Sequence, residues 1–302
     1  MNKIFITGAN GFVGSHLVRE LQKRNLNFVA GTRALYGDIC SQTNWDSILD
    51  GCDVVVHLAA RVHIMQDSSI DSLKTFRQHN VEASLNLAKT AKKVGVKKFI
   101  YLSSVKVNGE ETTKKPFFAN DLPAPEDAYG ISKMEAEIEL LKLHEAGIFE
   151  IVIIRPPLVY GPGVKANFQR LFKIVSKQVP LPFGLVKNKR SLISVYNLVD
   201  LIITTISHLN SGGKIFLASD DRDYSLVDIL ELMAKVQVKS LILIPVPLSL
   251  LNFIALILGQ KAYANRLLGD LVVDISEAKS LLNWKPPYSF ENTYLLNGKN
   301  YD

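Results

Sequence analysis

Short apolar runs recur along the first half of the chain, and longer segments with a different apolar spacing separate them. The short runs cover residues 3–7, 27–30, 53–58, 98–102 and 151–154. Runs of this length with few polar positions are typical of strands that are buried on both faces of a sheet. The longer segments, such as 14–24 and 81–94, place apolar residues three and four positions apart, as amphipathic helices do. Strands that alternate with helices predict an α/β fold with a doubly wound parallel sheet.

The spacing of apolar residues changes after the fifth predicted strand. From residue 156 onward the elements become shorter, and glycine and proline interrupt them. We therefore predict a larger sheet domain over residues 1–155 and a smaller C-terminal lobe over 156–302, with a return of the chain to the sheet around 190–200. Only residues 31–37 follow the second strand before the next Gly-Asp-Ile segment, so a helix common in such folds is expected to be short or missing there.

One segment is apolar over nearly the length of a membrane span. Residues 241–259 contain no charged side chain, but Pro245 and Pro247 interrupt any helix in its first half. We predict a short strand at 241–244, a turn, and a helix from about Ser249 that packs inside the protein or at an oligomer interface. Membrane contact is not expected.

Composition excludes several classes of protein. The chain has 302 residues, of which 47% are hydrophobic and 21% charged, as in a folded globular protein with a sizeable core. The 35 basic and 29 acidic residues give a net charge of +6 without a run of basic residues, which argues against nucleic acid as a partner. The two cysteines, Cys40 and Cys52, have no metal-type spacing, so we expect a reducing, cytoplasmic location and no metal. The N-terminal segment lacks the features of a signal peptide.

The first predicted strand runs directly into a glycine-rich turn. Glycines stand at positions 8, 11 and 14, between this strand and an amphipathic helix. Gly8 suits a tight turn, Gly11 lets the backbone approach a diphosphate, and Gly14 lets helix and strand pack closely. This arrangement predicts a Rossmann-type dinucleotide site at the start of the helix, formed by Gly8, Asn10, Gly11, Phe12, Val13 and Gly14.

The end of the second strand bears on the choice between the two nicotinamide dinucleotides. An acidic residue there would bind the ribose hydroxyls and repel a 2′-phosphate, but this chain has Arg33, whose guanidinium suits that phosphate. NADP(H) is therefore the expected cofactor, with NAD(H) as the alternative. Further ligands of the adenosine half are predicted at Asp38, Ile39, Leu58, Ala59 and Ala60.

A tyrosine and a lysine that share one helix face mark the chemical end of the site. Tyr129 and Lys133 are four residues apart, after the fourth strand. A free phenol titrates near pH 10, and a neighbouring ammonium group favours its ionised form. Ser104 follows the fourth strand and can hydrogen-bond the reacting oxygen. We predict Ser104, Tyr129 and Lys133 as the catalytic residues, with Tyr129 and Lys133 also touching the cofactor.

Over nearly its whole length, the sequence resembles the extended short-chain dehydrogenase/reductase family, in particular its nucleotide-sugar epimerases and reductases. The motifs that carry the resemblance are TGANGFVG, HLAA, LSS, YGISK, IRPPLVYGPG, RSLISVYNLVD and LLNWKP. The resemblance implies that Asn80 and Pro156 contact the cofactor. It also implies a substrate site for a UDP-sugar that includes Ser104, Lys106, Asn167, Phe168, Arg190 and Arg266.

The resemblance leaves two main reactions open. Dehydratases of the family have Asp-Glu after the catalytic hydroxyl residue, whereas Val105 and Lys106 stand here, so dehydration is not expected. The first interpretation is reduction of a UDP-linked 4-keto-6-deoxyhexosamine, giving a sugar such as UDP-N-acetylquinovosamine for surface polysaccharide. The alternative is a UDP-glucose or UDP-N-acetylglucosamine 4-epimerase with tightly bound NAD, and the remote one a non-catalytic NADP-sensing regulator.

Relatives often dimerise through two helices that correspond here to residues 81–94 and 129–143, so a homodimer is expected. His57 is interpreted as a packed strand-end residue, and His63 as part of a loop at the cleft.

Overall fold

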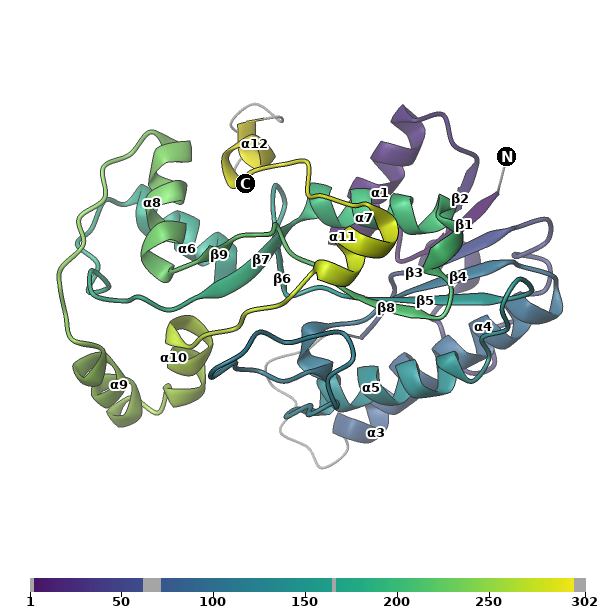
Figure 1. Ribbon diagram of the computed structural model, residues 1–302, viewed down its shortest axis with the longest axis horizontal. Coiled ribbons are helices and arrows are strands. Elements are labelled where there is room, and N and C mark those ends of the chain that lie inside the picture. The colour runs from purple at the N-terminus through teal and green to yellow at the C-terminus, as the bar shows by residue number, and fades with distance from the viewer. Residues whose placement is uncertain (1–2, 62–71, 165–166, 296–302) are drawn as a thin grey trace.

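The computed structural model describes residues 3–61, 72–164 and 167–295. His63 lies outside these ranges. Within them, a parallel sheet of six strands has the order β2-β1-β3-β4-β5-β8 (Figure 1). Its strands are β1 (Ile4–Thr7), β2 (Phe28–Ala30), β3 (Val54–His57), β4 (Lys98–Leu102), β5 (Glu150–Arg155) and β8 (Lys214–Leu217).

Helices cover both faces of this sheet, as the doubly wound prediction requires. Figure 1 shows α1 (Phe12–Lys23) and α7 (Val195–Ser207) on one side, and α4 (Ala83–Lys93) and α5 (Ala128–Leu141) on the other. Smaller elements connect or flank these layers: α2 (Arg33–Tyr36), α3 (Ser72–Phe76), the π-helix η1 (Arg77–Glu82), η2 (Val105–Val107), η3 (Leu209–Ser211) and α11 (Ser276–Leu282). The short α2 confirms the expected reduction of the helix after β2.

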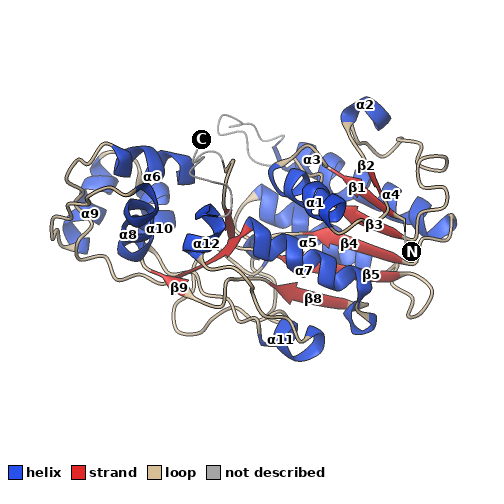
Figure 2. Ribbon diagram, turned by 90° about the horizontal axis from the view of Figure 1, so that it is seen from above, coloured by secondary structure: helices blue, strands red, loops and turns tan. Residues whose placement is uncertain are grey.

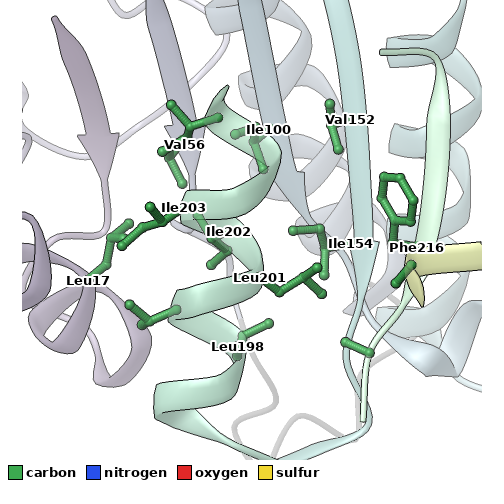
Figure 3. Packing of buried hydrophobic residues seen from close by; sticks show 14 of the residues in the cluster. Leu17, Val56, Ile100, Val152, Ile154, Leu198, Leu201, Ile202, Ile203 and Phe216 are labelled. Carbon is green, nitrogen blue, oxygen red and sulfur yellow. The ribbon is translucent and has the colours of Figure 1, made fainter. Parts of the chain in front are cut away.

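Alternate residues of the central strands supply two separate cores. Val56, Ile100 and Val152 point to the face covered by α7, where they meet Leu201 and Ile202 (Figure 3). Their neighbours along the strands, such as Val55, Phe99 and Ile151, pack against α4 and α5 instead. Side chains that alternate in this way are buried on both faces, which explains the continuous apolar runs in the sequence.

A second lobe contains a small sheet and a helical end. Its strands β6 (Leu158–Tyr160), β7 (Arg190–Ser194) and β9 (Asp223–Tyr224) lie in the order β6-β7-β9. Its helices are α6 (Asn167–Ser176), α8 (Leu226–Gln237), α9 (Leu248–Ile257), α10 (Lys261–Leu268) and α12 (Phe290–Leu295). Between β7 and β9, the chain adds α7 and β8 to the larger sheet. The division at residue 155 stays a prediction.

The uncharged segment 241–259 forms the expected helix, but in place of the expected strand at 241–244 it forms only an isolated bridge, and the helix is not packed as expected. A bridge joins Leu181 to Leu243, and α9 begins at Leu248. No residue of α9 is buried, because only Leu251 and Ala255 reach the core of the lobe. The prediction that this helix packs inside the protein is therefore wrong for the single chain. Across the described ranges, no helix has both the length and the apolar character that crossing a bilayer requires.

Candidate active site

The glycine-rich turn lies between β1 and α1 and touches the segment that follows β3. Gly8 has a φ of +70°, and a Cβ there would lie 2.9 Å from the Ala59 nitrogen. A Cβ on Gly14 would come within 2.1 Å of the Gly8 carbonyl oxygen, so side chains are excluded where helix and turn meet. Gly11 precedes the first turn of α1 and provides no side-chain cap for its N–H groups. This backbone cradle fits the diphosphate of a dinucleotide.

The other residues predicted at the cofactor lie along the same edge of the sheet. Asn10 is exposed at the turn, while Phe12 and Val13 begin α1, and Leu58, Ala59 and Ala60 follow β3 half-buried. Pro156 follows β5, and its carbonyl accepts a 3.0 Å hydrogen bond from the Val105 N–H, which ties the ends of β4 and β5 together. Ligands of open parallel sheets bind at this carboxyl edge.

At the adenosine end, Arg33 is close to an acidic partner. Its Nε lies 2.8 Å from Oδ1 of Asp38, and both side chains are largely exposed. Ile39 is partly buried against the core cluster to which Leu87 and Ala88 of α4 belong. Because Arg33 and Asp38 form an ion pair, a 2′-phosphate at this position would compete with the Asp38 carboxylate.

The three predicted catalytic residues stand where β4 ends and α5 begins. Lys133 is fully buried, and its Nζ donates a 2.8 Å hydrogen bond to the carbonyl of Leu102, the last residue of β4. The same Nζ lies 5.9 Å from the centre of the Tyr129 ring, one helical turn earlier. Ser104 follows Leu102 by two residues, and its Oγ accepts a 3.2 Å hydrogen bond from the Lys106 N–H. The predicted residues therefore belong to two elements that pack on each other.

Burial opposes charge on both members of the Tyr129–Lys133 pair. It raises the pKa of Tyr129 well above 10, with a further contribution from the Asp127 charge. Burial lowers the pKa of Lys133 to about 7, which the Glu137 charge partly offsets. Without a ligand, the phenol thus keeps its proton and the lysine is poised to lose its own near neutral pH.

The Lys133 shift predicts a pH-dependent stability for the protein without cofactor. Below pH 7, Lys133 is charged in the folded and in the unfolded chain, so the full free-energy cost of burying its charge lowers the stability. Above pH 7, the folded chain releases the proton while the unfolded chain holds it up to about 10.5, so stability rises with pH. Lys133→Met lacks this rise, and its stability relative to the wild type should fall by roughly 2–3 kcal/mol between pH 6 and pH 9 in urea unfolding.

Lys142→Met is the control for this measurement, since Lys142 lies just beyond the same helix and is 63% exposed. The difference between this control and the wild type should stay constant with pH. If the stability difference between Lys133→Met and the wild type also stayed constant with pH, burial would not lower the pKa of Lys133.

Two buried polar residues beside the catalytic pair have structural partners. Asn80 accepts a 2.9 Å bond from the Arg61 N–H and donates a 3.0 Å bond to Ser132 on α5. His57 lies between the Thr7 and Ser84 hydroxyls at 2.6 and 2.8 Å. Burial and the Lys133 charge lower the pKa of His57 to about 3, so the ring is neutral at pH 7. This agrees with its interpretation from the sequence as a packed strand-end residue.

A chain of ion pairs and hydrogen bonds links α10 of the lobe to the start of α5. Lys106 pairs with Glu110 at 2.6 Å and also contacts the Asp127 carboxylate. Asp127 accepts a 2.7 Å bond from the Gly130 N–H and thereby caps α5 two residues before Tyr129. Arg266 of α10 reaches the other oxygen of Glu110 at 3.2 Å. Two predicted substrate residues, Lys106 and Arg266, are therefore brought together by Glu110.

The other predicted substrate residues lie in the lobe. Arg190 is half-buried at the start of β7 and donates a 2.9 Å bond to the Gly269 carbonyl, just beyond α10. Burial lowers its pKa, and the charges of nearby acidic groups, Glu110 among them, oppose this shift. Phe168 is only 2% exposed and stacks on Tyr160, so any substrate contact there is made by its backbone. The side chain of Asn167 lies outside the described residues.

Sequence reasoning missed a buried ion pair between α5 and β5. Glu137 of α5 receives 2.5 and 3.0 Å bonds from the guanidinium of Arg155 at the end of β5, and both side chains are 3% exposed. Arg155 also donates a 3.0 Å bond to Asn108. The sequence held one signal for Glu137, because it stands one helical turn after Lys133 on the same face of α5.

A glycine cradle at the first helix, together with a serine after the fourth strand and a tyrosine and a lysine on the helix that packs there, defines a dinucleotide-dependent enzyme of the short-chain dehydrogenase/reductase class. The chain belongs to the NAD dependent epimerase/dehydratase family, whose sequence pattern matches residues 4–218. It is 43% identical over 304 residues to a UDP-glucose 4-epimerase of Vibrio cholerae, covering 96% of this chain and 93% of that protein. The predicted family and enzyme class are thereby confirmed.

Solved structures agree with the fold. A UDP-glucuronic acid 4-epimerase of Bacillus cereus in complex with NAD has a TM-score of 0.73 at 22% identity, over 96% of this chain and 95% of its own. RMD from Pseudomonas aeruginosa complexed with NADPH has a TM-score of 0.74 at 20% identity, over 97% and 96% of the two chains. Both structures hold nicotinamide dinucleotides in the same type of fold, which confirms the predicted fold class.

Proposed function

We propose that this enzyme interconverts the C4 epimers of a UDP-linked hexose or N-acetylhexosamine and keeps NAD bound while it does so. The observation that carries the proposal is the end-to-end similarity to the Vibrio cholerae UDP-glucose 4-epimerase. The sequence alone favoured a 4-keto reductase, because Arg33 suited an exchangeable NADP(H) and because several motifs resembled a subgroup close to the 4-keto reductases. The ion pair with Asp38 offsets the positive charge of Arg33, which weakens the argument from Arg33 for NADP(H). Reduction of a 4-keto sugar is the second candidate.

The residues at the end of β4 are suited to moving a proton on and off the C4 oxygen. Tyr129 accepts the proton of the C4 hydroxyl and later returns it, and the Ser104 hydroxyl hydrogen-bonds the same oxygen. The Lys133 ammonium stabilises the ionised phenol, whose formation burial and Asp127 oppose. When bound, the oxidised nicotinamide supplies an acceptor for the hydride that leaves C4 of the sugar, and a positive charge that favours this phenolate.

The basic residues around Glu110 are suited to the diphosphate of the nucleotide. Arg190 and Arg266 approach this point from β7 and α10, and Lys106 from η2. Glu110 holds Arg266 and Lys106 in place while no diphosphate is bound. We propose that the diphosphate oxygens of the substrate replace Glu110 in part of these contacts. A diphosphate can bind both arginines at once, and this interaction is stronger than that of Glu110 with a single arginine.

The Arg33–Asp38 pair supplies a prediction about cofactor choice. Asp38→Asn removes the carboxylate that competes for Arg33 and repels a 2′-phosphate. The ratio of the NADP to the NAD dissociation constant should fall about fivefold, the effect of one exposed charge. Fluorescence titration of the cofactor-free protein measures both constants. Asp46→Asn, a neighbouring exposed carboxylate that pairs with Lys93, is the control. An unchanged ratio in Asp38→Asn would place Asp38 away from the 2′-position.

The reaction itself is tested with purified protein and no added cofactor. UDP-glucose and UDP-N-acetylglucosamine are incubated separately, and proton NMR follows the C4 epimers. Equilibration of either pair, with NAD released on denaturation, supports the proposal. A protein that leaves both unchanged but consumes NADPH with UDP-4-keto-6-deoxy-N-acetylglucosamine would be a 4-keto reductase.

A further inference from the structure

Helix α9 exposes apolar side chains at the end of the lobe. Figures 1 and 2 both place it far from the six-stranded sheet. Phe253 is 56% exposed and Ile257 is 68% exposed, and Leu250, Ile254, Leu256 and Leu258 are exposed as well. Its residues are apolar except for Ser249 and Asn252. A helix that is apolar on nearly all sides requires an apolar partner.

Positive charge is concentrated around this helix. The segments 163–191 and 238–269 together contain ten of the 35 basic residues and no acidic residue. The remainder of the chain holds 25 basic and all 29 acidic residues, so the excess of positive charge comes from these two segments. They lie side by side, since the Ile244 N–H donates a backbone hydrogen bond to the Leu181 carbonyl and the Gly184 N–H donates another to the Ile244 carbonyl.

Most of these basic side chains are free to meet a charged surface. Arg190 and Arg266 belong to the active site, but seven others within the described ranges are exposed: Arg170, Lys173, Lys177, Lys187, Lys189, Lys239 and Lys261. Lys239 and Lys261 flank the apolar segment on either side. A pocket between α9 and α10 is lined by Phe253 and Leu256 together with Lys261, so apolar and cationic groups meet in one place.

These features favour one occupant over another. A second copy of the chain would bring two regions with an excess of positive charge together, which like-charge repulsion opposes. An anionic phospholipid surface instead offers acyl chains to α9 and negative headgroups to the surrounding lysines. We propose that the α9 end of the lobe is a peripheral binding site for anionic phospholipid membranes, with α9 lying in the interface. This inference is independent of the reaction proposed above.

Vesicle co-sedimentation tests the site. The full-length enzyme should pellet with vesicles of phosphatidylglycerol and phosphatidylcholine, pellet poorly with phosphatidylcholine alone, and be released by salt. Phe253→Glu/Ile257→Glu places charge on the exposed face of α9 and should weaken binding about tenfold or more. Lys239→Glu/Lys261→Glu should weaken it to a similar degree, because each basic residue near an anionic surface contributes about fivefold.

Matched variants separate this site from general effects. Leu209→Glu, at a residue 87% exposed on the sheet domain, and Lys142→Glu should bind vesicles like the wild type. Turnover without vesicles should be unchanged in the α9 variants. Absence of vesicle binding, equal binding to phosphatidylcholine, or equal losses in the matched variants would overturn the proposal. A change of oligomeric state in the α9 variants, measured by light scattering without vesicles, would assign this face to a second copy of the chain and also overturn it.

Discussion

Tyr129→Phe is expected to lower turnover about a thousandfold while leaving dinucleotide binding intact, the usual range for loss of a general acid–base group. The substitution removes one oxygen and keeps the aromatic ring, whose centre lies 6.1 Å from the centre of the Phe76 ring, so the fold should tolerate it. Lys133 keeps its bond to the Leu102 carbonyl and therefore its position beside the end of β4. Turnover with the UDP-sugar substrate, and cofactor content after gel filtration, measure the two effects.

Tyr288→Phe is the control for this substitution, because Tyr288 contacts the ring of Tyr196 rather than α5. It should retain wild-type turnover. If Tyr129→Phe turned over within tenfold of the wild type, proton transfer would have to be assigned to another group.

The second large effect is on stability. Glu137→Gln leaves the buried Arg155 guanidinium without its counter-charge and should destabilise the protein by about 3–5 kcal/mol. The three short contacts between the two side chains, and their burial, make this pair unlike any surface ion pair. Urea unfolding monitored by tryptophan fluorescence measures the loss.

Glu135→Gln provides the comparison on the same helix. Glu135 pairs with Arg77 at 2.6 Å, but Arg77 is 48% exposed, and loss of such a surface pair should change stability far less than loss of the buried pair. The double variant Glu137→Leu/Arg155→Met removes both charges and should recover most of the stability that Glu137→Gln loses. Equal effects of Glu135→Gln and Glu137→Gln would mean that water reaches the buried pair.

The sheet could be predicted because each buried strand reads as a short apolar run. The five predicted strands occur within one residue of their expected ends. The unexpected exposure of α9 has a physical reason, since an apolar sequence shows that a helix needs an apolar partner but not whether that partner belongs to the same chain. The charge difference between the two ends of the molecule was hidden in a net charge of only +6.

The site could be predicted where local spacing sets the geometry. The glycine turn and the Tyr129–Lys133 pair each lie within one turn or one helix face, so their spacing is visible in the sequence. The links among Lys106, Glu110, Asp127 and Arg266 join segments up to 156 residues apart, and no periodicity reveals such contacts. The same holds for Arg155 and Glu137, which come from a strand and a helix.

The π-helix η1 determines the register between the two halves of a longer helix. Each residue advances an α-helix by about 100°, so removing one residue between 77 and 82 would rotate α3 by about that angle relative to α4. Phe76 would then turn away from Tyr129, while α4 kept its place on the sheet. Insertions and deletions of single residues in η1 thus give evolution a way to change the surroundings of Tyr129 in discrete steps, without altering the core beneath α4.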